Sequence, residues 1–227
     1  MINECIICNS KVEYLDKDEE MECILCHKKE NSKIRCINGH YVCNDCHMKG
    51  INDIFDICMK EQSTNPLNIL DKLMKQSFCH MHGPEHHILV GASIITAYYN
   101  AKKDMKPDES LKEMINRGKK VPGGICGYWG SCGAAVSSGI AMSIITQSTP
   151  LETEAFRLSN LMTSKALEKI ACNGGPRCCK RDSYLAILTA IDFIYENLNV
   201  KLEKKDILCE YSNLNKQCIK EKCPFNK

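Results

Sequence analysis

The sequence predicts a mainly α-helical fold, in which a helical bundle follows a small zinc-binding module of the treble-clef or ribbon type. Paired cysteines are concentrated in residues 5–46, apolar residues recur at helical spacing after them, and strand-like alternation is scarce after residue 60. We therefore divide the chain into a zinc-binding module at 1–60, a helical cysteine-rich domain at 61–205 and a cysteine-containing tail at 206–227.

The zinc prediction comes from the spacing of cysteines in the first segment. Three Cys-x2-Cys pairs and one Cys-x3-His pair supply eight ligands, which are Cys5, Cys8, Cys23, Cys26, Cys36, His40, Cys43 and Cys46. A Cys-x2-Cys turn directs two thiolates toward one ion, and four thiolate or imidazole ligands complete a tetrahedral shell. Eight ligands therefore predict two structural zinc ions.

Two pairings of these ligands agree with the spacing. In the crossed pairing, the pairs that begin at Cys23 and Cys43 share one ion, and the pairs that begin at Cys5 and Cys36 share the other. In the sequential pairing, the first four cysteines form a zinc ribbon. The residues KIRCINGHYV, with Asn38-Gly39 at their tip, predict a β-hairpin.

A knuckle, a hairpin and a Cys-x2-Cys pair at a helix start resemble a treble clef, which favours the crossed pairing. This arrangement is similar to RING and FYVE modules. The order departs from RING because the extra Cys-x2-Cys pair comes first, so the resemblance implies no ubiquitin-ligase activity.

The helices are predicted from apolar periodicity and from start signals. Ile51, Ile54, Phe55 and Cys58 recur at helical spacing, and residues 63–66 read Ser-Thr-Asn-Pro, a turn and helix-start signal. Pro84 suits the first position of a helix that ends near residue 102. Further helices are expected at 107–117, 132–147, 151–171 and 177–198. The helix near 132–147 has small residues almost all round, so we expect it at the centre of the bundle.

Composition restricts the functional classes. The chain has 227 residues, of which 17 are cysteine and 7 are histidine, with a formal net charge of +2. This near-neutral charge leaves nucleic-acid binding without support. No stretch resembles a signal peptide or is long and apolar enough to span a bilayer, so we expect a cytoplasmic protein with no membrane partner. In a reducing compartment, this many cysteines indicate metal ligation or thiol chemistry.

Two glycine-rich loops carry the next cysteines, and each ends where a helix is expected to begin. The first contains Cys126 and Cys132, and the second contains Cys178 and Cys179. Helix N-termini and a basic flank are expected to lower the pKa of these thiols. The basic residues are Arg177, Lys180 and Arg181. We predict that the two loops converge on one reactive or cluster-binding site, with ordinary tight turns as the alternative.

The tail carries a third group, Cys209, Cys218 and Cys223. The last of these precedes a proline, a combination that recurs at iron–sulfur ligation. Three such cysteines either leave one iron open for a substrate or sulfide, or take a fourth ligand from elsewhere. We predict an iron–sulfur cluster of the 4Fe–4S type, held by cysteines of the tail and the two loops, with a third zinc as the alternative.

Histidines gather around Glu85 in the segment 79–87. We predict that His82, His86 and Glu85 move protons in a reaction, with capping and packing as the alternative role. We interpret three other candidates as structural: His27 and His47 as surface neighbours of ligand cysteines, and Cys58 as a core residue.

The stretches MHGPEHHILVGA, VPGGICGYWGSCGAA and GGPRCCKRDSYLAI resemble an uncharacterised cysteine-rich domain family of anaerobic archaea and bacteria, found alone or fused to methyltransferase-like modules. The resemblance covers most of the chain. It implies that these loops form one site, and it implies no reaction.

Two functional classes remain. The first is an iron–sulfur enzyme for thiol redox or sulfur transfer, in which Cys178 and Cys179 are attacking thiolates or ligands and a sulfur or electron donor protein is the partner. The alternative is a zinc-stabilised adaptor that binds protein or nucleic acid without catalysis. Adjacent cysteines seldom ligate one structural zinc together, which favours the first class. No phosphate-binding loop, dinucleotide fingerprint or radical-SAM triplet is visible.

Overall fold

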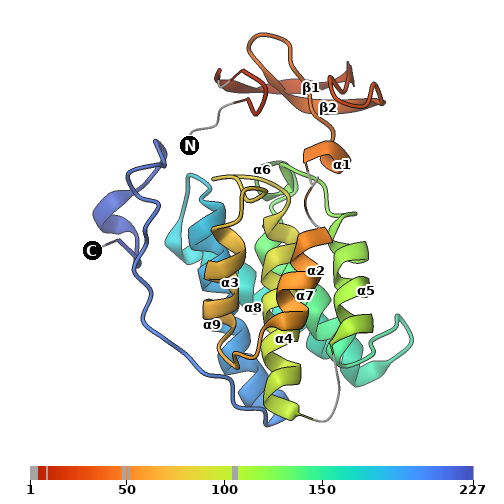
Figure 1. Cartoon of the computed structure of the whole chain (residues 1–227), viewed down its shortest axis with the longest axis vertical. Helices are drawn as coiled ribbons and strands as arrows, with labels where there is room; N and C mark the ends of the chain where they lie inside the picture. The colour runs from red at the N-terminus through yellow and green to blue at the C-terminus, as the bar shows by residue number, and fades with distance from the viewer. Residues whose placement is uncertain (1–4, 9, 48–49, 51, 104–106, 227) are drawn as a thin grey trace.

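The computed structural model describes residues 5–8, 10–47, 50, 52–103 and 107–226. A small N-terminal β-hairpin module covers one end of a helical bundle, and the C-terminal tail runs along the side of the bundle (Figure 1). The predicted class, mainly helical with an N-terminal cysteine module, is confirmed. No helix in the described part of the chain is long and apolar enough to cross a membrane.

The module contains one antiparallel hairpin of β1 (Val12–Glu22) and β2 (Lys29–Cys36). Val12 pairs with Cys36 at one end of the hairpin, and Glu22 pairs with Lys29 at the other. Most of β1 is charged and exposed, so its sequence has no apolar face that would have predicted a strand.

The hairpin predicted around Asn38-Gly39 is wrong, because only a tight turn forms there. The amide of Cys36 donates to the carbonyl of His40 at 2.8 Å. After the turn, Tyr41 makes an isolated bridge to Cys23 and no second strand follows. The turn brings Cys36 and His40 together. The bridge holds Tyr41 against the Cys-x2-Cys pair that begins at Cys23.

The bundle contains the four helices predicted after residue 106, and their ends lie within two residues of the predicted ones. The helices of the chain are α1 (Asn44–His47), α2 (Asn52–Lys60), α3 (Pro66–Met74), α4 (His86–Lys102), α5 (Asp108–Gly118), α6 (Ile125–Tyr128), α7 (Gly133–Ile145), α8 (Thr153–Asn173), α9 (Cys179–Leu198) and the 3₁₀ turn η1 (Lys220–Lys222). The four predicted after residue 106 are α5, α7, α8 and α9. Helix α4 begins two residues after Pro84, with Glu85 as its N-cap residue. Ile51 lies outside the described residues.

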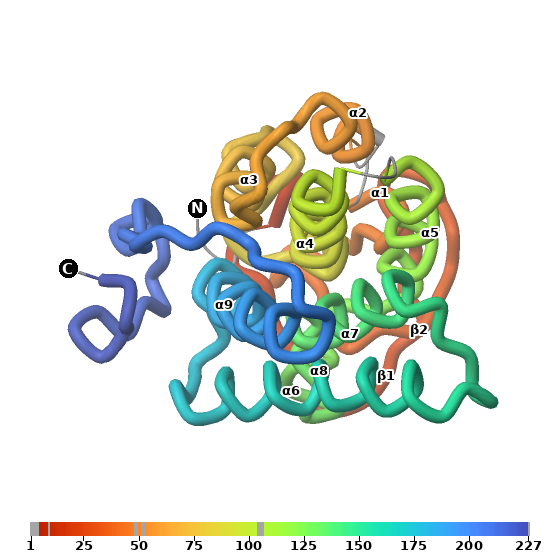
Figure 2. The backbone as a smooth tube through the Cα atoms, turned by 90° about the horizontal axis from the view of Figure 1, so that it is seen from below, coloured from red at the N-terminus to blue at the C-terminus, as the bar shows by residue number. Residues whose placement is uncertain are grey.

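Helix α7 lies at the centre, as its small residues predict, and packs on α4, α5, α8 and α9 (Figure 2). The amide of Gly91 in α4 donates to Ser137 Oγ of α7 at 2.9 Å. A Cβ atom at Gly139 would come within 1.8 Å of Thr163 Oγ1 in α8. Small residues therefore set the spacing between α7 and its neighbours.

Helix α2 and the tail both attach to the bundle. Ile54 and Cys58 of α2 are buried in its core, which confirms the interpretation of Cys58. The boundary predicted at residue 60 stays a prediction. The segment that leads from α9 to the tail is fixed by the amide of Glu203, which donates to the carbonyl of Thr64 at 3.1 Å. The tail itself is held by Phe225, which packs edge-on against Tyr184.

Candidate metal centres and the cavity between them

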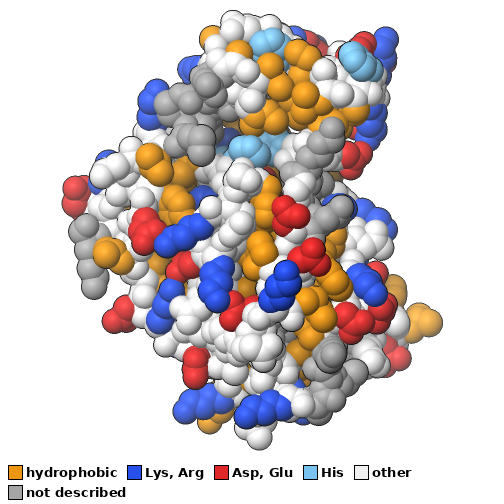
Figure 3. Space-filling model, viewed as in Figure 1, with side chains coloured by type: hydrophobic (Ala, Val, Ile, Leu, Met, Phe, Trp, Pro, Cys, Tyr) orange, Lys and Arg blue, Asp and Glu red, His pale blue; other side chains and the backbone are white. Residues whose placement is uncertain are grey.

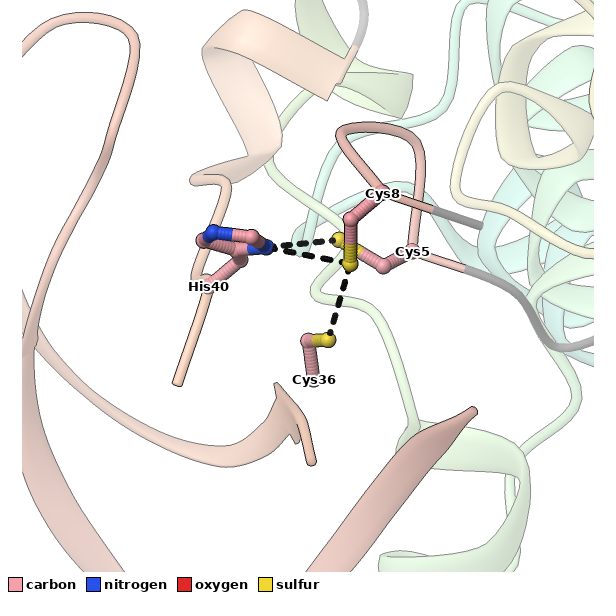
Figure 4. A group of neighbouring side chains, drawn as sticks. All are labelled: Cys5, Cys8, Cys36 and His40. Atoms are coloured by element: carbon pink, nitrogen blue, oxygen red, sulfur yellow. Dashed lines mark hydrogen bonds between the residues drawn. The ribbon is translucent and has the colours of Figure 1, made fainter. Parts of the chain in front are cut away.

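The first group of predicted zinc ligands comes together from three segments of the module: the knuckle at 5–8, the end of β2 and the following turn. His40 Nδ1 lies 3.2 Å from Cys8 Sγ and 3.6 Å from Cys5 Sγ, and the sulfurs of Cys8 and Cys36 are 3.5 Å apart. Figure 4 shows these side chains pointing toward one another. Metal bonds of about 2.0–2.3 Å in a tetrahedron place ligand atoms roughly 3.3–3.8 Å apart, so the spacing fits a zinc shell.

The second group contains Cys23, Cys26, Cys43 and Cys46, whose sulfurs all lie within 4.8 Å of one another. Cys26 Sγ is 3.5 Å from Cys43 Sγ, and the amide of Cys43 donates to Cys23 Sγ at 3.4 Å. The two groups are those of the crossed pairing. The sequential pairing would have required Cys5 and Cys8 to lie with Cys23 and Cys26, and they do not.

A cavity of about 890 Å³ lies between the module and the bundle, and we call it the module–bundle cavity. Apolar and histidine side chains gather where the two parts meet (Figure 3). Among the residues predicted to carry out the chemistry, His82, Cys126 and Cys179 line it. Arg177 lines it as well, stacked 5.2 Å from the ring centroid of Tyr14.

Cysteines of the two glycine-rich loops share this region. Cys132 is the N-cap residue of α7, as its loop predicts. Burial raises the pKa of Cys132 to about 12, and negative charge on Asp182 and Cys126 adds to that rise. Burial likewise raises the pKa of Cys179, to which charge on Cys132 contributes. These mutual effects place Cys126, Cys132 and Cys179 in one neighbourhood.

The expectation of a lowered pKa is wrong for Cys132, Cys178 and Cys179, because burial outweighs the lowering effect of Arg177 on Cys179 and of Arg181 on Cys178. Burial raises the pKa of Cys178 as well, because a thiolate loses its hydration there. All three basic side chains have other partners, and Arg177 stacks on Tyr14. Arg181 pairs with Asp182 at 3.1 Å, and Lys180 Nζ donates to Cys79 Sγ at 3.0 Å.

Cys178 lines a different cavity from Cys179. It lines a small second cavity together with the three tail cysteines, and we call Cys178, Cys209, Cys218 and Cys223 the tail cysteine ring. Two of the tail sulfurs accept hydrogen bonds of 3.4 Å from backbone amides, Cys209 from Tyr211 and Cys218 from Lys220. Asn215 Nδ2 donates to Cys178 Sγ at 3.6 Å. Cys178 of the second glycine-rich loop therefore lies beside the three tail cysteines.

The two histidines expected to move protons, His82 and His86, lie in different surroundings. His82 precedes α4, and its Nε2 lies 3.4 Å from Asn215 Oδ1. His86 is buried with Nδ1 3.1 Å from the carbonyl of Gly83, and burial lowers its pKa to about 3. Burial, with Arg177 adding to it, lowers the pKa of His82 to about 4. Both imidazoles are neutral near pH 7.

Two further groups of ligand atoms were not predicted from the sequence. His47, His80 and Glu85 form one, and Cys79, Glu85 and His86 form the other. The interpretation of His47 as a surface neighbour is wrong, because its side chain is only 20% exposed and faces Glu85. His27, which also follows a ligand cysteine, is 76% exposed and pairs with Glu22, as expected for a surface residue. The two histidines have the same local sequence signal, so only the docking of α1 on the bundle distinguishes them.

Comparison with known proteins identifies a family for the helical part of the chain. No curated protein and no solved structure matches the chain. A family model described as a family of unknown function, DUF5714, matches residues 54–226. The match includes both glycine-rich loops, Glu85 and the tail cysteine ring, whereas the eight predicted zinc ligands precede it. We conclude that the chain belongs to the DUF5714 family.

Proposed function

We propose that the protein is an iron–sulfur protein for thiol redox or sulfur transfer, stabilised by two structural zinc ions. The observation that carries the proposal is the tail cysteine ring, in which four cysteines from two distant segments line one small cavity. Four cysteine thiolates are the usual ligand set of a 4Fe–4S cluster. Such a cluster, when bound, supplies one-electron transfer.

The surroundings of the ring suit a cluster. Backbone amides donate to Cys209 and Cys218, and hydrogen bonds of this kind stabilise the negative charge on a ligated sulfur. Tyr184 and Phe225 line the same cavity and limit its contact with water. Pro224 follows Cys223, as it does at many cluster ligands.

The thiols that would meet a substrate lie in the module–bundle cavity. Cys126 and Cys179 line it, with Cys132 close to both. Arg177 lines the same cavity and favours an anionic substrate. Because Cys179 follows Cys178 directly, their Cα atoms are about 3.8 Å apart, which gives electrons a short path between the ring and the cavity thiols. A sulfur or electron donor protein is the partner that this chemistry requires.

Purification without oxygen tests the proposal. We expect iron and acid-labile sulfide in equal amounts, together with at least two zinc ions per chain and a visible absorption band. Cys209→Ser and Cys218→Ser should remove most of the iron and leave the zinc. Cys172→Ser is the matched control, because this cysteine is exposed at the end of α8 and belongs to neither group. Iron-free wild-type protein, or ring variants that keep their iron, would overturn the proposal.

A zinc-stabilised adaptor is the second candidate, and one observation favours it. The tips of both knuckles expose apolar side chains, namely Ile6, Ile7, Ile24 and Leu25. Exposed apolar clusters of this kind often mark docking surfaces. The same metal analysis separates the candidates, since an adaptor contains zinc without iron or sulfide.

A further inference from the structure

We propose a third mononuclear metal site, formed by His47, His80 and Glu85 where the zinc module meets the bundle. It would take a divalent transition metal ion such as Zn²⁺ or Fe²⁺, because two imidazoles and one carboxylate are a common ligand set for these ions. The site goes beyond the proposed function, since none of its ligands belongs to the two zinc shells or to the tail cysteine ring.

The distances within the group match metal ligation better than hydrogen bonding. His47 Nδ1 lies 3.6 Å from Glu85 Oε2, and His80 Nδ1 lies 3.5 Å from Glu85 Oε1. Hydrogen bonds to nitrogen are usually 2.7–3.2 Å long. Bonds of about 2.0–2.1 Å from a tetrahedral ion would hold the ligand atoms roughly 3.3–3.5 Å apart.

All three ligand residues have a buried atom without a hydrogen-bond partner in the described part of the chain: His47 Nδ1, His80 Nδ1 and Glu85 Oε2. The side chain of Glu85 is completely buried. A buried carboxylate oxygen without a partner destabilises the folded chain, because it loses its hydration and gains no hydrogen bond in return. One cation bound by all three residues would remove this penalty, and this is the observation that carries the inference.

The backbone around Glu85 fixes the carboxylate in position. The amide of His80 donates to Oε1 at 2.8 Å, so this oxygen is held. A Cβ atom on Gly83 would lie 2.1 Å from Oε2 and 2.6 Å from Oε1. Only glycine leaves room for the carboxylate at this place.

The neighbouring group of Cys79, Glu85 and His86 is a poorer metal site. The buried ammonium of Lys180 lies 3.0 Å from Cys79 Sγ, where its charge would repel a cation. His86 Nδ1 already faces the carbonyl of Gly83 at 3.1 Å. We therefore assign the metal to the His47 group.

Two consequences follow from where the ligands come from. His47 belongs to the module, whereas His80 and Glu85 belong to the bundle, so a bound ion would tie the two parts together. His47 and His80 also line the module–bundle cavity. Three protein ligands leave a fourth position, which water or an anionic donor atom of a cavity ligand could fill, as at catalytic zinc sites.

Metal counting on the full chain, purified without oxygen, tests this site. His47→Ala should lower the metal content by one ion per chain and leave acid-labile sulfide unchanged. His27→Ala is the matched control, because His27 also follows the second cysteine of a Cys-x2-Cys pair, and it should keep the wild-type content. His80→Ala should cause the same loss as His47→Ala, and the double variant should lose no more than either single variant.

Wild-type metal content in folded His47→Ala or His80→Ala would overturn the site. The two ligands come from different elements, so if one variant fails to fold by circular dichroism, the other decides the question. Failure of the proposed function looks different, because it appears as acid-labile sulfide missing from the wild-type protein.

Discussion

Cys178 and Cys179 are consecutive in the chain, yet their side chains enter different sites. Cys178 lines the small cavity with the tail cysteines, and Cys179 lines the module–bundle cavity. Cys178 is the N-cap residue of α9 with extended backbone (φ −142°, ψ 99°), and Cys179 is the first residue of the helix. The change of backbone conformation between them turns the two sulfurs apart. The two thiols therefore line two separate cavities.

This separation predicts different effects of the two serine variants. Cys178→Ser should remove most of the iron and sulfide, because it takes a ligand from the tail cysteine ring. Cys179→Ser should keep the iron and lose only the alkylation of position 179, because Cys126 lines the same cavity and stays available to thiol reagents. Iron analysis and alkylation mapped by mass spectrometry measure both. Equal loss of iron in the two variants would contradict the assignment.

Metal removal should unfold the module and spare the bundle. Binding to a structural zinc shell supplies ~10 kcal/mol or more of folding free energy, and the module buries little else besides its ligands. Strong chelators should therefore expose residues 10–47 to trypsin, while the helical circular dichroism persists. Lys28, Lys29, Lys33 and Arg35 are the diagnostic cleavage sites. A module that stays resistant to trypsin after complete zinc loss would show that its fold does not depend on metal.

The packing of α7 against α8 predicts a sensitive glycine. Gly139→Ala would place a Cβ atom 1.8 Å from Thr163 Oγ1 and 3.1 Å from the carbonyl of Ser159. We expect a loss of about 1–3 kcal/mol in unfolding free energy, since the backbone carbonyl can move only with its helix. Thr163→Ala in the same chain should restore part of it. Gly127→Ala, which meets no atom within 4 Å, is the control in denaturant unfolding and should be nearly neutral.

Local sequence signals predicted the parts of the fold that local chemistry determines. Asn65 precedes Pro66 in the sequence, and its side chain accepts from the amide of Leu67 at 3.0 Å to cap α3. The zinc groups were predictable for a similar reason, because a Cys-x2-Cys turn already places two ligands together. The crossed pairing required only a choice between two arrangements.

Contacts between segments that are distant in the chain could not be predicted from local sequence patterns. His47 meets Glu85 only because α1 packs onto the end of the bundle, and Cys178 meets the tail only because the tail returns along α9. The raised pKa of Cys179 depends on burial, which nearby basic residues in the sequence do not reveal. Strand β1 was missed because a charged hairpin has no apolar alternation.

The buried thiol of Cys58 predicts how stability changes at alkaline pH. It lies on the buried face of α2, 1% exposed, and burial raises its pKa from 9.0 to about 11. Below pH 9 the thiol is protonated in both the folded and the unfolded chain, so it contributes no pH dependence. Between pH 9 and 11 the unfolded chain releases this proton while the folded chain retains it. The unfolding free energy should therefore fall as pH rises through this interval, by about 3 kcal/mol from this thiol.

Urea unfolding of the wild type and Cys58→Ala at pH 8 and pH 10.5 measures this contribution. The alanine variant should be less stable at pH 8, because it leaves a small space in the core. Its stability should nevertheless fall less between the two pH values, since the titrating thiol is gone and every other ionisable group is shared. Cys172→Ala is the matched control, because Cys172 is exposed, and it should follow the wild-type pH dependence. Parallel curves for the wild type and Cys58→Ala would mean that the Cys58 thiol ionises as readily in the folded chain as in the unfolded one.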